Sequence, residues 1–238
     1  MGLFSSLLGG KKSSEEQQKK DERRKFDVLK YDGVRARSMG QLPYAIKCFE
    51  EALALQADGE TMSFLAGAYL QANRMDDARS VLERWVAADA GNVSGWLSLS
   101  QVCFLQEDYD RMAAAAAQAI QADGSSAAAH YQAGKAAYRR NDCLQAIVML
   151  TQALALDEKY TEAYLLKGTL LLERRRTAEA LAVFDEAIEL MPENARMYEG
   201  RGRVRLAAGD KTGALEDVKK AIALDPACAQ RIDGSFSR

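Results

Sequence analysis

Residues able to perform catalysis or bind a metal are few and scattered in this chain. Its only histidine is His130, and its four cysteines, Cys48, Cys103, Cys143 and Cys228, show no C-x-x-C spacing. Zinc sites need several Cys or His ligands close together, and Ser-His-Asp or Cys-His catalysis needs a histidine beside its nucleophile. The phosphate-binding patterns G-x-x-x-x-G-K and G-x-G-x-x-G are also absent. The sequence therefore predicts no enzymatic activity, no metal site and no cofactor.

Acidic residues recur regularly, and this recurrence indicates structure rather than paired-carboxylate catalysis. Aspartates stand at the junctions between successive helical blocks, at Asp58, Asp89, Asp123, Asp157 and Asp225. Turn and capping chemistry explains a carboxylate that returns with a structural period. The histidine and the cysteines are likewise expected to be packing residues, the cysteines as reduced thiols. Reduced thiols favour a reducing compartment, so we expect the folded body to be cytoplasmic.

The stretch 161–194 shows which elements the chain is built from. We expect two helices in this stretch. The first has an apolar face formed by Tyr164, Gly168 and Leu171, and the second has one formed by Ala180, Leu181, Phe184, Ala187 and Ile188. Gly168 and Ala180 are small where the helices would cross, and Pro192 cannot continue the second helix. Two helices of about a dozen residues cannot bury their apolar faces alone. Because the pattern returns every 34 residues, we expect the pairs to stack in an array.

This stretch resembles a tetratricopeptide repeat (TPR). The residues that match the family's pattern are Tyr164, Gly168, Ala180, Phe184, Ala187 and Pro192, while Lys167 and Leu171 depart from its Leu and Tyr positions. The resemblance implies an all-α fold, a right-handed α-solenoid of antiparallel helix pairs known as the TPR superhelix. It also implies a non-enzymatic protein-binding scaffold, in which the first helix of each repeat, helix A, lines a concave groove that holds a peptide or a partner helix.

Six tandem repeats are expected, at residues 26–58, 59–92, 93–126, 127–160, 161–194 and 195–228. Between helix A and the second helix, helix B, each repeat has a break residue; these are Gly40, Asn73, Glu107, Asn141, Arg175 and Gly209. Most are types that tolerate left-handed backbone. The third repeat has the run Ala113–Ala117 in helix B, and we expect the superhelix to tighten there.

The C-terminal residues 229–238 are expected to be a polar tail, too short for the extra helix that commonly seals such arrays. Helix B of the sixth repeat is unusually polar, with Lys211, Glu216, Asp217, Lys219 and Lys220. We expect this helix to seal the array itself. The alternative is that this end stacks on another protomer.

Charge is distributed unevenly along the chain. The composition is 48% hydrophobic and 28% charged with three prolines, which fits a folded, helical chain. The formal net charge is -2, and residues 1–25 carry seven Lys and Arg against four acids. The remainder is therefore acidic, which argues against nucleic acid as a ligand.

Residues 1–25 differ from the repeats and form a separate N-terminal segment. Its first part could lie in a membrane interface, with apolar and basic contacts from Gly2, Leu3, Phe4, Leu7, Leu8, Lys11 and Lys12. Gly2 and Ser6 also fit the N-myristoylation pattern, which matters only in a eukaryotic host. A mobile tail, or a strip that packs on the end of the solenoid, is the alternative. Residues 13–25 fit a solvated helix or a charged linker.

The groove residues are those that the resemblance places on the inner face of helix A. They are Leu97, Gln101, Phe104, Tyr131, Lys135, Tyr138, Leu165, Thr169, Leu172, Arg196 and Arg203. An apolar centre with a charged rim suits a peptide or an amphipathic helix of a protein partner. For the leucines, packing between repeats is the alternative.

One known use of the family is a clamp that grips the C-terminal carboxylate of Hsp70 or Hsp90. Here Lys30 is followed four residues later by Val34 instead of Asn, so the clamp pattern is absent and we expect no binding of those tails. Two functions remain open: a peptide-binding adaptor held near a membrane by its N-terminus, and a structural assembly protein that associates through its ends or convex face.

Overall fold

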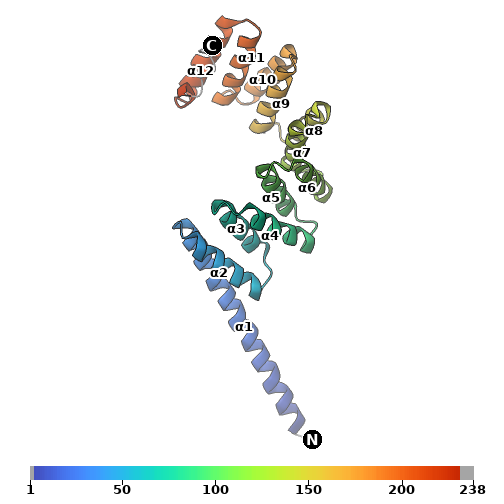
Figure 1. Ribbon diagram of the computed structural model, residues 1–238, viewed down its shortest axis with the longest axis vertical. Coiled ribbons are helices and arrows are strands. Elements are labelled where there is room, and N and C mark those ends of the chain that lie inside the picture. The colour runs from blue at the N-terminus through green and yellow to red at the C-terminus, as the bar shows by residue number, and fades with distance from the viewer. Residues whose placement is uncertain (1–2, 231–238) are drawn as a thin grey trace. The chain divides into compact units, whose positions relative to one another are not determined.

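The computed structural model describes the backbone of residues 3–230 and the side chains of residues 16–230. Over this range the chain forms twelve helices (Figure 1). Their bounds are α1 (Leu3–Ser38), α2 (Leu42–Leu55), α3 (Gly59–Gln71), α4 (Met75–Ala88), α5 (Val93–Leu105), α6 (Tyr109–Ala122), α7 (Ala127–Arg139), α8 (Cys143–Leu156), α9 (Thr161–Glu173), α10 (Thr177–Leu190), α11 (Ala195–Ala207) and α12 (Lys211–Leu224). Helix pairs thus recur at the positions expected for six repeats.

The helices belong to two compact units, residues 1–106 with α1–α5 and residues 107–238 with α6–α12. Within each unit, every helix packs against the helices before and after it in the chain. In the second unit α7 also contacts α9, and α9 contacts α11, so the A helices form one continuous row. The division falls inside the expected third repeat, since α5 belongs to the first unit and α6 to the second.

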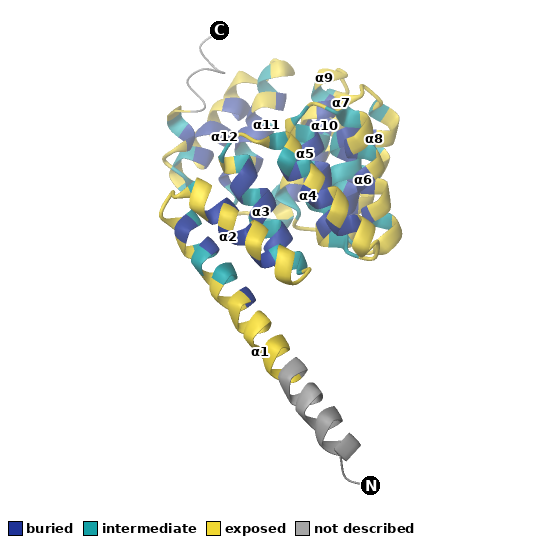
Figure 2. Ribbon diagram, turned by 60° about the horizontal axis from the view of Figure 1, so that its bottom comes forward, coloured by how far each residue is buried: buried dark blue, intermediate teal, exposed yellow. Residues whose placement is uncertain are grey.

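Helix α1 joins the charged N-terminal segment to the first repeat without a break. Residues 16–25 are exposed, whereas Phe26, Gly33 and Ala36 are buried (Figure 2). Of the two expectations for residues 13–25, the solvated helix is therefore the one observed over residues 16–25, whose side chains the structure describes. The expected membrane-contact residues Gly2, Leu3, Phe4, Leu7, Leu8, Lys11 and Lys12 lie outside the described side chains, so that contact stays a prediction. Among the described residues, none of the helices combines the length and the apolar composition of a membrane-spanning segment.

In three of the helix pairs, a glycine on helix A lies very close to a large side chain on helix B. A Cβ added at Gly33 would lie 2.5 Å from Phe49, and one added at Gly134 would lie 2.9 Å from Leu150. At Gly168 the added carbon would overlap the ring of Phe184, which is only 1% exposed. The glycine position of the repeat pattern is thus fixed by packing, because any larger residue displaces the core side chain below it.

The six break residues all adopt left-handed backbone. The positive φ values are 74° at Gly40, 56° at Asn73, 59° at Glu107, 62° at Asn141, 57° at Arg175 and 86° at Gly209. At most of these breaks the next residue donates its N–H back across the turn, as from Arg176 to the Leu171 carbonyl at 2.9 Å. This is the hydrogen bond of a Schellman cap, which ends a helix and reverses the chain. The predicted positions are therefore confirmed.

Aspartates at the repeat junctions serve turns and caps, as predicted. Asp58 accepts a hydrogen bond from the backbone N–H of Thr61 at the start of α3. After α6 and α8, Asp123 accepts from the N–H of Ser125 and Asp157 from that of Lys159. Such bonds satisfy backbone donors that a helix end or a turn leaves unpaired.

The sixth repeat departs from expectation at Asp217. The other four polar residues named for α12 are exposed, but the Asp217 side chain is only 3% exposed. It accepts hydrogen bonds from Arg201 at 2.7 and 3.0 Å, and it forms an ion pair with Arg205 at 3.0 Å. The expectation that Asp217 contributes to a solvated sealing face is therefore wrong: two arginines of α11 make its burial possible. Residues 228–230 are also helical, and Cys228 is buried against Val218 and Ala221.

His130 and three of the cysteines lie in the core, as predicted for packing residues. His130 is 7% exposed, and its Nδ1 lies 3.1 Å from the carbonyl oxygen of Ser126. All four cysteines are free thiols; Cys48, Cys103 and Cys228 are buried, and Cys143 is partly exposed. These side chains therefore act as small apolar or hydrogen-bonded packing groups.

The left-handed backbone at Arg175 predicts a stabilising substitution. A non-glycine residue in this conformation costs about 1–2 kcal/mol, so Arg175→Gly should raise the free energy of unfolding by about 1 kcal/mol. Arg174, with φ -86°, is the matched control, and Arg174→Gly should leave stability unchanged or lower it. Thermal unfolding followed by circular dichroism measures both. A destabilised Arg175→Gly variant would contradict the cap geometry.

The crossing at Gly168 predicts the opposite effect. Gly168→Ala should lower the free energy of unfolding by about 1–3 kcal/mol because the new methyl group displaces Phe184. At Gly124 the nearest atom to an added Cβ is 3.8 Å away, so Gly124→Ala should change stability by no more than about 0.5 kcal/mol. Chemical denaturation of the two variants tests this difference, and equal stabilities would count against the close crossing.

Candidate functional site

Two of the three predicted groove residues of the first unit lie along a hollow between α3 and α5. Leu97 and Gln101 line it together with Leu70, and its volume is about 350 Å³. Phe104 lies one turn further along α5, is partly exposed and does not line the hollow. The structure thus brings two of these three predicted residues together.

In the second unit, Tyr138 contacts the neighbouring repeat, and Tyr131 packs where α7 meets the start of α9. The rings of Tyr131 and Tyr160 lie 5.0 Å apart, and Tyr131 packs against the core that α9 and α10 share. The hydroxyl of Tyr138 lies 2.8 and 3.0 Å from the two carboxylate oxygens of Glu173, and it donates to this carboxylate. Both tyrosines therefore have a structural role on the A-helix face, in addition to any role in binding.

Lys135 lies between these tyrosines on α7 and is partly buried. Desolvation lowers the pKa of its ammonium group, and repulsion from Arg139 lowers it further. The cause is the cost of keeping a charge away from water beside a second cation.

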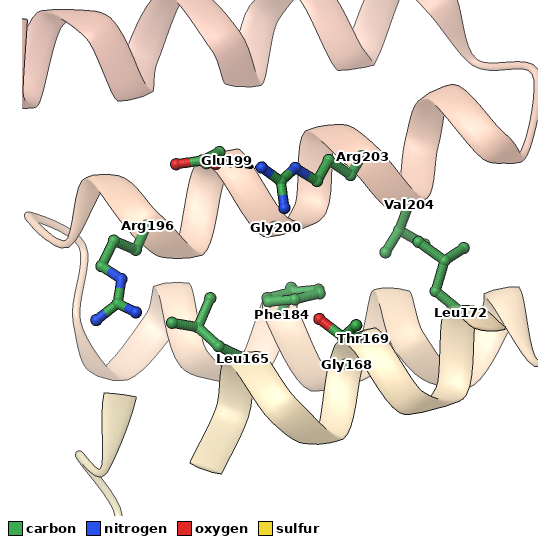
Figure 3. A pocket seen from close by; sticks show the side chains of 10 residues that line it. All are labelled: Leu165, Gly168, Thr169, Leu172, Phe184, Arg196, Glu199, Gly200, Arg203 and Val204. Carbon is green, nitrogen blue, oxygen red and sulfur yellow. Dashed lines mark hydrogen bonds and ion pairs between the residues drawn. The ribbon is translucent and has the colours of Figure 1, made fainter. Parts of the chain in front are cut away.

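The remaining five predicted residues surround one pocket between α9 and α11. Its volume is about 270 Å³, and it is lined by Leu165, Gly168, Thr169, Leu172, Phe184, Arg196, Glu199, Gly200, Arg203 and Val204 (Figure 3). The side chains from α9 face those from α11 across the ring of Phe184. The sequence-based prediction therefore identified one wall from α9 and the two arginines of the other.

Two glycines create the floor of this pocket. Added carbons at Gly168 and at Gly200 would both overlap the ring of Phe184, so the ring is held between two helices that have no side chain at these points. The ring itself fills the space at both glycines and forms the floor of the pocket. Sequence reasoning missed Gly200, although the spacing of Gly200 and Gly202 offered the signal that this helix carries a glycine beyond the one that the repeat needs.

The rim of the pocket is charged. Arg196 forms an ion pair with Glu162 at 3.0 Å, and Arg203 forms one with Glu199 at 2.6 Å. The two arginine side chains are 51% and 48% exposed, whereas that of Glu199 is 10% exposed. Thr169 is exposed at the mouth. The pocket can accept an apolar side chain at its floor and polar groups at its rim.

The described residues contain no cluster of His, Cys, Asp or Glu that could hold a metal ion. Lys30 is the residue that was compared with the lysine of the family's carboxylate clamp. Its ammonium group forms ion pairs with Asp58 at 2.9 Å and with Glu60 at 2.6 Å. These contacts tie α1 to the start of α3.

Solved structures with this fold cover most of the chain. A tetratricopeptide repeat protein from Parabacteroides merdae has a TM-score of 0.69 at 16% identity, and the match covers 84% of this chain and 80% of that one. PilF from Pseudomonas aeruginosa has a TM-score of 0.67 at 17% identity, with coverages of 87% and 94%. YrrB, described as a TPR protein with an unusual peptide-binding site, has a TM-score of 0.55 at 22% identity, with coverages of 75% and 92%. These similarities confirm the fold class.

Family models agree with the structural comparison. No curated protein matches the chain. Two models described as tetratricopeptide repeat match residues 36–102 and, in two overlapping copies, residues 131–191 and 165–227. Proteins with such repeats mediate protein–protein interactions, bind protein or peptide partners and are generally not enzymes. Because the matches together span more than half of the sequence, the chain belongs to the tetratricopeptide repeat family.

Proposed function

We propose that this chain is a non-enzymatic adaptor that binds a peptide or an amphipathic helix of a partner protein against α9 and α11. The pocket over Phe184 carries this proposal, because it combines an apolar floor with a charged rim. Protein interfaces commonly have this anatomy, with an apolar side chain of one partner anchored in a desolvated pocket of the other. The peptide-binding site described for YrrB supports the proposal by analogy of fold.

A second candidate function is structural assembly through the outer face, and α8 favours it. This helix contains no charged residue, and it exposes Leu144 by 77% and Val148 by 47%. Exposed apolar side chains that lie together on a surface often mark a protein contact. Thr151 lies on the same face, one turn beyond Val148, and is exposed.

Two matched substitutions separate these functions. Thr169→Trp places a large ring in the mouth of the pocket, and Thr151→Trp places the same ring on the outer face of α8. Both positions are exposed, so both variants should fold with melting temperatures close to the wild type. Affinity capture from the native host, quantified by mass spectrometry, should show Thr169→Trp losing a partner that Thr151→Trp retains, at least about tenfold, or roughly 1.4 kcal/mol.

The opposite pattern would overturn the adaptor function. If Thr151→Trp loses the partner and Thr169→Trp keeps it, the outer face of α8 is the interaction surface and assembly is the better account. Capture that is unchanged in both variants would exclude both surfaces.

The N-terminal residues 2–12 are proposed to hold the adaptor reversibly at an anionic membrane surface. Four apolar side chains and two lysines in this segment support weak binding of a few kcal/mol. The full-length chain should therefore pellet with vesicles that contain anionic lipid, and a variant without residues 1–12 should stay in the supernatant. Neutral vesicles are the control, since they lack the headgroup charge. Equal pelleting of the two chains would end this proposal.

The free thiols also support a proposal about the cellular compartment of the protein. The buried positions of Cys48, Cys103 and Cys228 are separate packing sites, and thiols of this kind persist in reducing surroundings. We therefore propose that the protein resides in the cytoplasm.

A further inference from the structure

The four arginines of α11 divide into two pairs with different surroundings. Arg201 and Arg205 hold the buried carboxylate of Asp217, and their side chains are only 17% and 25% exposed. Arg196 and Arg203 line the pocket and are about half exposed. The first pair therefore stabilises the end of the solenoid, whereas the second faces the space that a partner would occupy.

Arg196 and Arg203 stand two helical turns apart on the same face of α11. Seven residues at about 1.5 Å each separate their backbones by about 10 Å. The side chains of Leu165 and Phe184, which form part of the apolar floor, lie between them (Figure 3). A ligand that enters this pocket would thus have a cation on each side of its apolar group.

Both guanidinium groups keep capacity for a ligand. Each has five N–H donors, and among the residues whose side chains are described each forms an ion pair with one glutamate, Arg196 with Glu162 and Arg203 with Glu199. The pair of Arg196 with Glu162 is exposed on both sides, and exposed pairs contribute only about 0–1 kcal/mol. A carboxylate of a partner can therefore replace the contact of Arg196 at little cost, and it can join Arg203, which keeps its pair with the largely buried Glu199.

We propose that this pocket recognises a helical segment of a partner in which two acidic residues, two turns apart, flank an apolar residue. The apolar side chain enters above Phe184, and the two carboxylates pair with Arg196 and Arg203. Residues three or four apart share one face of a helix. The two acids of the segment are therefore seven positions apart, and the apolar residue lies three or four positions after the first acid. This inference rests on the proposed adaptor function and specifies its partner.

The size of the pocket agrees with a single side chain. At about 270 Å³ it is smaller than most pockets that enclose a complete small ligand, which measure about 300–1,000 Å³. A partner peptide in an extended conformation would need its two acids only three positions apart, because a strand covers about 10 Å in three residues. Acid spacing therefore distinguishes a helical partner from an extended one.

A displayed library of random peptides of about 16 residues, roughly four helical turns, tests the inference without knowledge of the natural partner. Selection on the full-length chain is followed by removal of every peptide that also binds the Thr169→Trp variant. The remaining peptides should be enriched in acids seven positions apart with an apolar residue between them. Synthetic copies should lose at least about tenfold in affinity when both acids become Lys, or when the ionic strength is raised to screen the pairs.

Variants of the chain provide the reciprocal measurement. Arg196→Gln with Arg203→Gln should bind the selected peptides at least about tenfold more weakly, and Arg201 must be left in place because it holds Asp217. Loss of Arg203 removes its ion pair with the largely buried Glu199, so Arg196→Gln alone is the second variant, and melting curves confirm folding. Arg196→Gln alone should still weaken binding measurably.

The outcomes separate the two proposals. The inference is overturned if the selected peptides lose binding to the Thr169→Trp variant but contain no pair of acids, or contain acids three positions apart. The adaptor function is retained in that case. Selection that yields no peptide sensitive to Thr169→Trp counts against both.

Discussion

Close approach of paired helices at a glycine is the contact on which the rest of the second unit depends. Phe184 can occupy the core only because Gly168 has no side chain at the crossing, and the same absence at Gly200 allows α11 to reach the other side of the ring. The ring thus links three helices. The ring also lines the pocket between α9 and α11. Packing and the candidate binding site therefore share one side chain.

Polar contacts between repeats then hold the A helices side by side. Glu162 and Arg196, 34 residues apart, occupy the same position in successive repeats, and Tyr138 reaches Glu173 in the next repeat. These bonds are exposed and individually weak, but they repeat along the row. A binding surface built on such a row is preorganised, which reduces the entropy that binding must overcome. The same side chains can then exchange their partners for those of a ligand.

The sequence alone predicted those parts of the fold that depend on residues close together in the chain. Left-handed backbone at Asn141 or Gly209 and the glycine position at Gly168 follow from local turn chemistry and from the repeat period. Burial of Asp217 was not predictable, because it depends on two arginines that precede it by 16 and 12 residues on another helix. The contact of Tyr138 with Glu173 and the floor that Gly200 provides likewise arise only when separate repeats pack. The repeat pattern thus predicts which residues lie on one face of a helix. Contacts with the neighbouring repeat determine which of these residues remain available to bind a partner.

The central claim is that a partner binds on α9 and α11 and leaves the outer face of α8 free. Methyl NMR tests it within one molecule, because Leu165, Leu172 and Val204 line the pocket while Leu144 and Val148 are exposed on α8. The methyl resonances of both groups should be followed while the captured partner, or a selected peptide, is added. The account predicts that the three pocket residues shift and that the two residues on α8 stay unchanged. Shifts confined to Leu144 and Val148 would contradict it.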